Sequence, residues 1–514
     1  MNKALFLRHN IFIKLSKKVK IIFFRKKHKK QLDLSAKIPA QNDDEQRVPD
    51  DISQCEALLK SIFGKSPDII IRRFETRKGD AIIFFVDGLV SNDLVDRDML
   101  TPMKSDEFNG DVLSILNVPC KEYEKISEVI SNVLSGCTAI FYKNSGKAVV
   151  ADLRMWSMRS VEIPDSEAVI RGPKEGFNEN LRTNTSLLRR KIKNPKLIIE
   201  NMTLGTQTNT FISLVYIEGI VNLRVLEELK GRLAKIDSDA ILESGYIEQF
   251  IEESPFSPVP RAGLTQKPDV LAARILEGRV GIMCDGTPHV LTVPHLFVEN
   301  IQTSEDYYSR TLLGSFMRMI RVTAIFISVL LPGLYVAITT FHQEMIPVVF
   351  LNTIITSVEQ TPLPVGAEVF FLILMFELLR ESGTRLPKAV GSAISIVGAL
   401  IIGDAAVSAG IVSSPVVIVV ALAAVCSFIV TSLNEFITLY RLVFLLLGGL
   451  MGLIGIATGV MFMITQVVST ESFGIPITDS FSKEERKDAF LRFPLTQMKF
   501  RPQSIVGKNW RRQK

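Results

Sequence analysis

The stretch 164–192 combines a turn-forming loop with four arginines and several acids. Arginines beside a Gly-rich turn can bind a phosphate or carboxylate, because guanidinium and backbone N–H groups both donate to oxyanions. Acids alternate with these arginines, so the charges can also pair with one another at an interface between domains or subunits, which is the interpretation that we favour. The residues that we assign to this assembly segment are Glu167, Arg171, Gly172, Pro173, Lys174, Glu175, Gly176, Arg182, Asn184, Arg189 and Arg190.

A second group of polar residues lies in 346–359, between long apolar runs. As a helix this stretch is about 21 Å long, which is too short to cross a bilayer. Helical periodicity places Asn352, Thr356 and Glu359 on one face, with Thr353 beside them. The pattern is typical of a re-entrant, pore-lining element, and equally of an amphipathic helix that rests at the membrane surface. We take these four residues as candidates for an ion path.

Asp404 is the fifth candidate for the ion path, because it lies inside an apolar run. A carboxylate in the middle of a bilayer costs about 2.5–3.5 kcal/mol on insertion scales, so it is expected to face a partner, a polar cavity or an ion. The alternative is a hydrated position near the outer end of a tilted helix. Glu368, Glu377, Glu435 and Arg441 lie nearer to the ends of apolar runs, and we interpret them as solvated, capping or boundary charges.

The motifs of common enzyme classes are missing from the sequence. It contains no dinucleotide-binding glycine motif, P-loop, HExxH or GxSxG. Its five cysteines show no CxxC spacing and two of its five histidines lie in a basic N-terminal arm, so we expect no metal site, no cofactor and no enzymatic activity.

Hydropathy divides the 514 residues into two different halves, a division that the mean hydropathy of +0.25 for the whole chain conceals. The sequence is mixed and charged up to about Tyr308, and apolar runs dominate the rest. Runs of this length predict about five membrane crossings. They lie at 322–340, 364–379, 389–412, 415–433 and 442–468.

Lysine and arginine residues lie on alternate sides of these runs, which places the N-terminal half in the cytosol. The region 483–514 carries ten Lys/Arg and three acids and also favours the cytosol, whereas five crossings would put it outside. Either the last run breaks at its glycines and turns back, or the tail begins too far from the membrane to influence orientation. The glycines concerned are Gly448, Gly449, Gly452 and Gly455, whose small size also favours close helix packing.

In the first half, β-like runs alternate with helical patterns, which predicts an α/β region of two subdomains. Asp285-Gly286 between two apolar runs predicts a hairpin turn. The predicted fold class is therefore a cytosolic α/β region of two subdomains followed by an all-α, multi-span membrane domain. The predicted parts are a basic arm and linker (1–50), the subdomains (51–160 and 161–309), the membrane domain (310–469) and a basic tail (470–514).

The arm carries eleven Lys/Arg and no acid within residues 1–30, and it lacks the apolar core of a signal peptide. We interpret it as a lipid-contacting arm, with a solvated tail or a nucleic-acid-binding arm as alternatives. Nucleic acid is not among the partners that we expect.

The assembly segment resembles the signature of the A subunit of spore germinant receptors, the GerA family. Three further stretches agree: Glu253-Ser254-Pro255-Phe256 with Pro268-Asp269, then 278–308 with its Asp285-Gly286-Thr287-Pro288 turn, and 385–403. The resemblance covers about residues 50–495.

This resemblance implies an integral protein of the spore inner membrane that acts with a transporter-like B subunit and a lipoprotein C subunit. It also implies nutrient sensing that starts germination, and a homo-oligomer that conducts ions, with the nutrient bound elsewhere in the complex. The alternatives are a secondary transporter with a cytosolic regulatory domain, or a membrane scaffold that conducts nothing.

Overall fold

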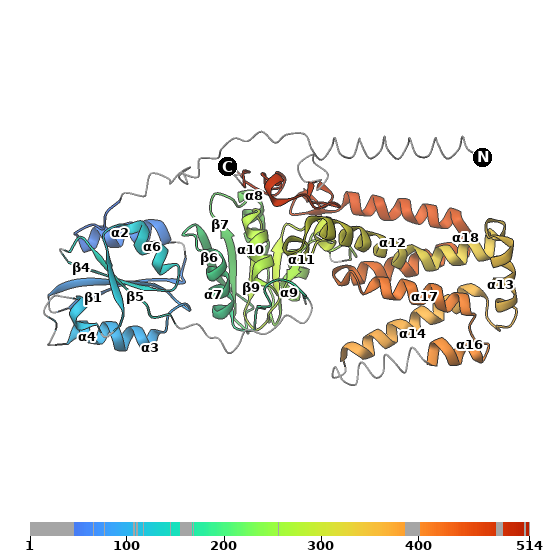
Figure 1. The fold of residues 1–514 in the computed structure, drawn as a ribbon, viewed down its shortest axis with the longest axis horizontal. Coiled ribbons are helices and arrows are strands. Elements are labelled where there is room, and N and C mark those ends of the chain that lie inside the picture. Colours follow the sequence, from blue (N-terminus) through green and yellow to red (C-terminus); the bar gives the residue numbers. More distant parts are fainter. Residues whose placement is uncertain are drawn as a thin grey trace, which may run out of the picture. The chain divides into compact units, whose positions relative to one another are not determined.

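The computed structural model describes residues 46–64, 66–76, 78–105, 108, 112–116, 118–143, 145–154, 167, 169–254, 256–385, 401–479, 487–507 and 510–512. These residues form two sheets with helices on their faces, a helical part and a C-terminal tail (Figure 1). The basic arm up to residue 45, the start of the assembly segment and much of the apolar run 389–412 lie outside them.

The first sheet has the strand order β1-β2-β4-β5-β3, and all neighbouring strands are antiparallel. Helices α2 and α6 cover one face and α3 and α4 lie on the other (Figure 1), so β2 is buried on both faces and reads as one apolar run. The elements are α2 (Ile52–Phe63), β1 (Ile69–Thr76), β2 (Gly79–Val86), α3 (Asn92–Val95), η1 (Asp96–Leu100), α4 (Thr101–Lys104), α5 (Val112–Ile115), β3 (Cys120–Tyr123), α6 (Ile126–Val133), β4 (Thr138–Tyr142) and β5 (Ala148–Ala151).

The second sheet has the order β6-β7-β9-β10-β8 and is also antiparallel throughout. Alternate residues of β7 point to opposite faces: Leu214 packs with α8 and α9, and Val215 packs with α7 and α10. The predicted turn joins β9 to β10. The elements are α7 (Leu181–Lys191), β6 (Leu197–Leu204), β7 (Thr210–Ile217), α8 (Leu223–Leu233), α9 (Ser244–Ile251), β8 (Gly263–Thr265), α10 (Pro268–Leu276), β9 (Val280–Cys284) and β10 (Val290–Val293).

The two sheets share one topology. Each unit starts with a helix (α2 or α7) and a long hairpin (β1-β2 or β6-β7). Helices then lead to the strand at the far edge (β3 or β8), and one more helix leads to a second hairpin (β4-β5 or β9-β10), which lies between the first hairpin and the edge strand. The chain therefore builds the same unit twice, a repeat that the sequence analysis did not detect.

Among the described residues, two helices of the helical part are long and apolar enough to cross a membrane, Thr311–Phe341 and Thr431–Ser469. They contain the first and last of the five predicted apolar runs. Two shorter apolar helices, Val348–Val358 and Ser414–Ser427, lie between them. The elements are η3 (Phe297–Asn300), α11 (Ser304–Tyr308), α12 (Thr311–Phe341), η4 (Gln343–Met345), α13 (Val348–Val358), α14 (Val365–Arg385), η5 (Ile401–Ala405), α16 (Ala406–Ser408), α17 (Ser414–Ser427), η6 (Thr431–Leu433) and α18 (Asn434–Ser469).

Helix α18 is a hairpin of two arms that turns back at Gly452, where φ is 62° and ψ is −141°. The Tyr440 hydroxyl donates to the Gln466 side chain, although 26 residues of straight helix would separate the two by about 39 Å. Gly459 of the second arm lies against the Phe444 ring of the first. The sequence analysis offered two explanations for a basic tail that favours the cytosol after five apolar runs. The structure shows the first of them, a break of the last run at its glycines.

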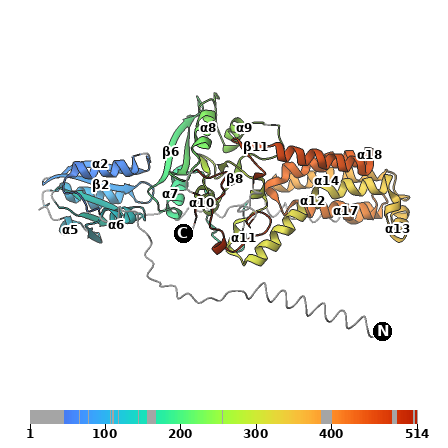
Figure 2. The ribbon, with the colours of Figure 1, turned by 90° about the horizontal axis from the view of Figure 1, so that it is seen from above.

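The helical part begins and ends against the second sheet. The first arm of α18 runs parallel to α12, because Arg441 lies beside Ser328 and Gly452 lies beside Phe341. α12, α17 and α18 lie side by side in both views (Figures 1 and 2). After α18, the short strands β11 (Glu471–Ser472) and β12 (Ile475–Pro476) return the chain to the second sheet, whose core receives Phe473, Ile475 and Ile505.

The hairpin generates a prediction for Gly452→Ala. A side chain at this left-handed φ is strained, and its Cβ would approach the Phe341 Cβ to 3.0 Å. We expect a loss of about 1–3 kcal/mol, seen as a lower melting temperature of the full chain in detergent. Gly383→Ala in α14, where an added Cβ meets nothing within 4 Å, is the matched control and should not lower it. Equal melting temperatures for the two variants would contradict the hairpin.

Candidate functional site

The assembly segment lies at the seam between the two sheet units. Arg189 of α7 donates from Nε and Nη2 to the two carboxylate oxygens of Asp68, at 2.8 and 3.1 Å. Both side chains are 1% exposed, and Asp68 directly precedes β1 of the first unit. A bidentate, fully buried pair of this kind fixes both distance and direction between the segments that carry it.

A second ion pair crosses the same seam, between Arg182 of α7 and Asp87 after β2. Beside it Gly88 has a φ of +84°, and a Cβ there would lie 2.2 Å from the Ser186 hydroxyl. Glycine is therefore required at this position both for its backbone conformation and for the close approach of α7.

The other residues of the assembly segment are held within the second unit. Asn184 is buried and exchanges two hydrogen bonds with the backbone of Asn178, and Glu167 accepts from Thr265 and from the Gln266 N–H. Glu175 accepts from Arg190, and Gly172 lies against the Tyr308 ring. Arg171 and Lys174 are exposed, Pro173 is half-buried and Gly176 is buried.

The arginines of the segment therefore point to different partners. Arg182 and Arg189 face the first unit, Arg190 faces Glu175, and Arg171 is exposed. The structure does not gather them around one anion. A role of the segment in assembly with other chains stays a prediction.

A buried charge cluster, which we call the junction, connects the second unit, the first turns of α12 and the tail. Arg318 of α12 is 0% exposed and donates to Asp306 of α11 at 3.0 Å and to Asp488 of the tail at 2.9 Å. Arg321, one turn further, donates to Asp306 at 2.8 Å. Tyr307 donates its hydroxyl to Asp488, and burial raises the pKa of this tyrosine well above its usual value.

Arg492 adds a further link, since it donates to the carbonyl oxygens of Ser309 and Tyr307 while its own N–H donates to Ser315. The sequence analysis missed the junction. It used Arg318 only as a positive charge before a membrane run, and no sequence signal connects this arginine to a tail acid 170 residues later.

The candidate ion-path residues of α13 are at the surface of the single chain. No residue of α13 is buried. Thr353 and Thr356 donate to carbonyl oxygens one turn earlier in the helix, and Asn352 and Glu359 are exposed. On the opposite face Leu351, Ile354 and Val358 are half-buried.

Asp404 is exposed in a π-helical turn, and none of the described residues forms an ion pair with it. The structure does not bring it into contact with the polar residues of α13 within the described part of the chain. The ion path therefore stays a prediction for all five residues.

Glu368, which we had interpreted as solvated or capping, and Arg441, which we had interpreted as a boundary charge, are both buried. Glu368 is 0% exposed and accepts from the N–H and hydroxyl of Ser413, the residue that caps α17. Arg441 is 1% exposed and donates to the backbone and hydroxyl of Ser328, with Glu377 at 3.4 Å. A solvated position for Glu368 and a mere boundary role for Arg441 were wrong, because distance from the end of an apolar run does not reveal the neighbouring helices. The capping role predicted for Glu368 agrees with its hydrogen bonds at the N-terminus of α17.

No group of three or more His, Cys, Asp or Glu among the described residues is placed to hold a metal ion.

A family model described as Bacillus/Clostridium GerA spore germination protein matches residues 57–504. The chain belongs to this GerA family. The resemblance inferred from the sequence is thereby confirmed.

Spore germination protein KA of Bacillus subtilis is 41% identical over 89% of this GerA-family chain and 87% of its own length. A membrane protein of the same organism, YfkQ, is 37% identical over 85% of this chain and 87% of its own length. The crystal structure of the N-terminal domain of the A subunit of the Bacillus megaterium germinant receptor GerK3 is 31% identical and covers 49% of this chain and 98% of its own, with a TM-score of 0.39.

The seam between the sheet units predicts the effect of Asp68→Asn. The substitution leaves the Arg189 guanidinium buried without its counter-charge, which costs about 3–5 kcal/mol. We expect a marked loss of thermal stability of the full chain in detergent. Asp80→Asn removes the partner of Arg73 in an exposed pair and is the control, since such pairs contribute about 0–1 kcal/mol. A loss no larger than that of the control would refute the structural role of the seam.

Acidic residues gather where α9 meets the start of α18. Burial raises the pKa of Glu248 to about 7, and the charges of Glu252, Glu435 and Glu243 act in the same direction. The protonated carboxyl is therefore favoured in the folded chain more than in the unfolded one, where its pKa is about 4.5. Its contribution to stability is full below pH 4.5 and disappears as the pH rises through 7.

Glu248→Gln should remove this pH dependence. At pH 8 the variant should be more stable than the wild type by up to about 3 kcal/mol, and near pH 5 the two should be similar. Melting temperatures at both pH values provide the measurement, and the exposed Glu227→Gln is the control. A variant that is less stable at pH 8 would show that the carboxylate is instead paired.

Proposed function

We propose that this chain is the A subunit of a nutrient germinant receptor in the spore inner membrane, where several copies form a ligand-gated ion conduit that starts germination. Membership of the GerA family supports the role in germination. The similarity to spore germination protein KA of Bacillus subtilis over most of both chains supports the same role. The expected partners are a transporter-like B subunit and a lipoprotein C subunit, and the role is non-enzymatic.

The observation that carries the conduit is the exposure of the polar residues of α13 at the surface of the single chain. This helix follows the candidate span α12, and Asn352, Thr353 and Thr356 are exposed on one face. Leu351, Ile354 and Val358 on the opposite face are half-buried. A hydrophilic face is stable at this depth when it meets water, and an apolar face is stable when it meets lipid or protein. A ring of copies satisfies both faces if the polar ones surround a water-filled axis.

Asp404 and the direction of the chain add to this proposal. A carboxylate exposed to lipid costs about 2.5–3.5 kcal/mol, and a neighbouring copy or an aqueous path removes that cost. The helical part begins at Thr311 and ends at Ser469, and both ends lie on the side of the second sheet, which the tail contacts. An even number of membrane crossings, with both sheet units in the cytosol, fits these contacts.

Ion release from germinating spores tests the proposed path. Asp404→Asn removes a charge, and Thr356→Ala removes a hydroxyl from the polar face of α13. We expect either to slow ion release severalfold while the protein level stays unchanged. Thr465→Ala is the matched control, because Thr465 is also exposed and donates to a carbonyl oxygen one turn earlier, at 2.8 Å against 2.9 Å for Thr356.

Wild-type rates in both path variants would remove these residues from the mechanism. Flux of a substrate through liposomes that contain this chain alone would favour the transporter. Cysteines introduced at Asn352 and Thr356, in a chain whose five natural cysteines are replaced, report the environment of α13. If they never react with a water-soluble thiol reagent, a scaffold that conducts nothing would be the better account.

A further inference from the structure

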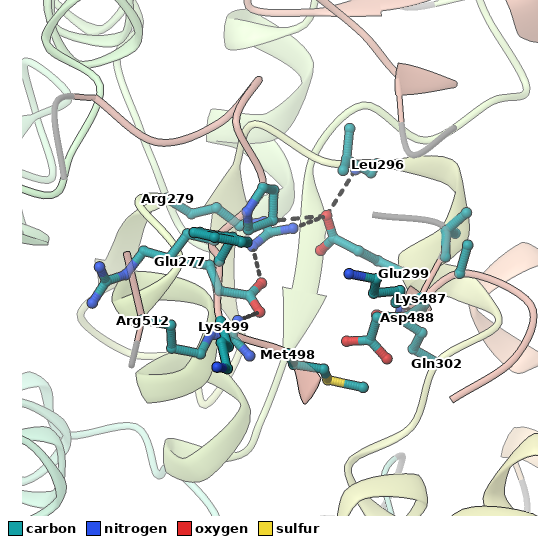
Figure 3. A pocket seen from close by; sticks show the side chains of 15 residues that line it. Glu277, Arg279, Leu296, Glu299, Gln302, Lys487, Asp488, Met498, Lys499 and Arg512 are labelled. Atoms are coloured by element: carbon teal, nitrogen blue, oxygen red, sulfur yellow. Dashed lines mark hydrogen bonds and ion pairs between the residues drawn. The ribbon is translucent and has the colours of Figure 1, made fainter. Parts of the chain in front are cut away.

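A cavity of about 70 Å³ lies beside the junction, between the second sheet unit and the C-terminal tail. Glu277 and Arg279 from the end of α10 and the start of β9 form one side, and Glu299 with Gln302 forms another (Figure 3). The tail closes the cavity with Lys487, Asp488 and residues 498–502 and 512. The volume exceeds what a single water molecule requires.

The three acids of the cavity already have cationic partners. Glu299 accepts from Arg279 at 2.8 Å, and Glu277 accepts from Arg279 at 2.6 Å and from Arg512. Burial alone would raise the pKa of Glu299, but the charges of Arg279, His295 and Arg274 hold it well below its usual value. Asp488 is bound by Arg318 of the junction. Each of the three carboxylates therefore already has a guanidinium partner.

The tail brings further cations to the same cavity by backbone pairing. The Arg501 N–H donates to the Trp510 carbonyl and the Arg512 N–H donates to the Lys499 carbonyl, both at 2.8 Å. The rings of Phe500 and Trp510 stack at 5.1 Å beside these bonds. Burial, and then the like charge of Arg512, lower the pKa of Arg501.

Lys499 completes this group, and none of the described carboxylates pairs with it. Residues 499–514 contain no acid at all. The fold thus holds several cations together at a cavity whose acids already have guanidinium partners, an arrangement that an added anion stabilises.

We propose that this cavity binds a compact oxyanion, a phosphate or carboxylate group, and that its occupancy acts on α12. Lys499 supplies a positive charge with which none of the described carboxylates pairs. Arg501, whose Nε donates to the Leu276 carbonyl at 2.7 Å, and Arg512, which also pairs with Glu277, add to it. Arg279 lies at the opposite side (Figure 3). The group comes either from a free small molecule or from a lipid headgroup. Nothing in this inference depends on ion conduction by the chain.

The connection to α12 passes through two residues of the cavity wall. Asp488 binds Arg318 through its carboxylate, and Gln302 donates to the Asp488 carbonyl at 2.6 Å. Arg318 also donates to the Ala489 carbonyl at 3.2 Å. An anion that orders residues 487–489 therefore restrains the first turns of α12, which continue into the candidate span.

Binding is measured with the full chain in detergent, by calorimetric titration of inorganic phosphate and of acetate, against chloride at equal ionic strength. We expect at least one of the two oxyanions to bind, and Lys499→Glu to weaken its binding at least about tenfold. Lys499 is exposed, so this variant should fold. Lys499→Arg should retain binding, and Lys235→Glu on an exposed turn after α8 is the matched control.

The proposal would be overturned if neither oxyanion binds to the wild type and anionic lipid has no effect. It would also be overturned if Lys499→Glu binds the oxyanion with the same affinity as the wild type. Nanodiscs with and without phosphatidylglycerol distinguish the two sources. If this lipid slows hydrogen exchange of the tail without added phosphate, and Lys499→Glu removes that effect, the site binds a lipid headgroup. Hydrogen exchange of residues 311–321 should slow when the site is filled, and unchanged exchange would refute the connection to α12.

Discussion

The buried guanidinium of Arg318 is the interaction on which the arrangement of the helical part depends. It lies where α11, the first turns of α12 and the tail meet, and two carboxylates, Asp306 and Asp488, bind it directly. Removing these charges from water is costly, and the two ion pairs together with the hydrogen bond to the Ala489 carbonyl offset that cost. Among the described residues Nη2 of Arg318 has no hydrogen-bond partner. The three segments are therefore held as one body, so a displacement of the second sheet unit or of the tail is passed to α12. A receptor that converts a signal into a change among membrane helices needs a rigid connection of this kind.

The two repeated sheet units add a second connection, through Asp68 and Arg189. Both buried arginine–carboxylate clusters join parts of the chain that have cores of their own. They determine how neighbouring parts are joined, while the apolar cores stabilise each part.

Much of the architecture could be predicted from local patterns. The alternation of β-like runs with helical patterns predicted the α/β character of both units, and Asp285-Gly286 between two apolar runs predicted the β9–β10 hairpin. The identical topology of the two units escaped notice, because strand order depends on contacts between distant residues. The same limit explains Arg441, which looks like a loop charge in the sequence and is buried against Ser328. Gly452 could be recognised as one of several glycines, but only its backbone conformation shows that the chain turns back there.

The central claim is that copies of this chain surround a water-filled path lined by the polar face of α13. Imaging of the purified full chain in lipid nanodiscs by single-particle electron microscopy tests this most directly. The account predicts a closed ring of copies in which Asn352 and Thr356 face the central axis. Single copies whose α13 rests at the lipid headgroups, or a ring with α13 on its outer rim, would contradict it.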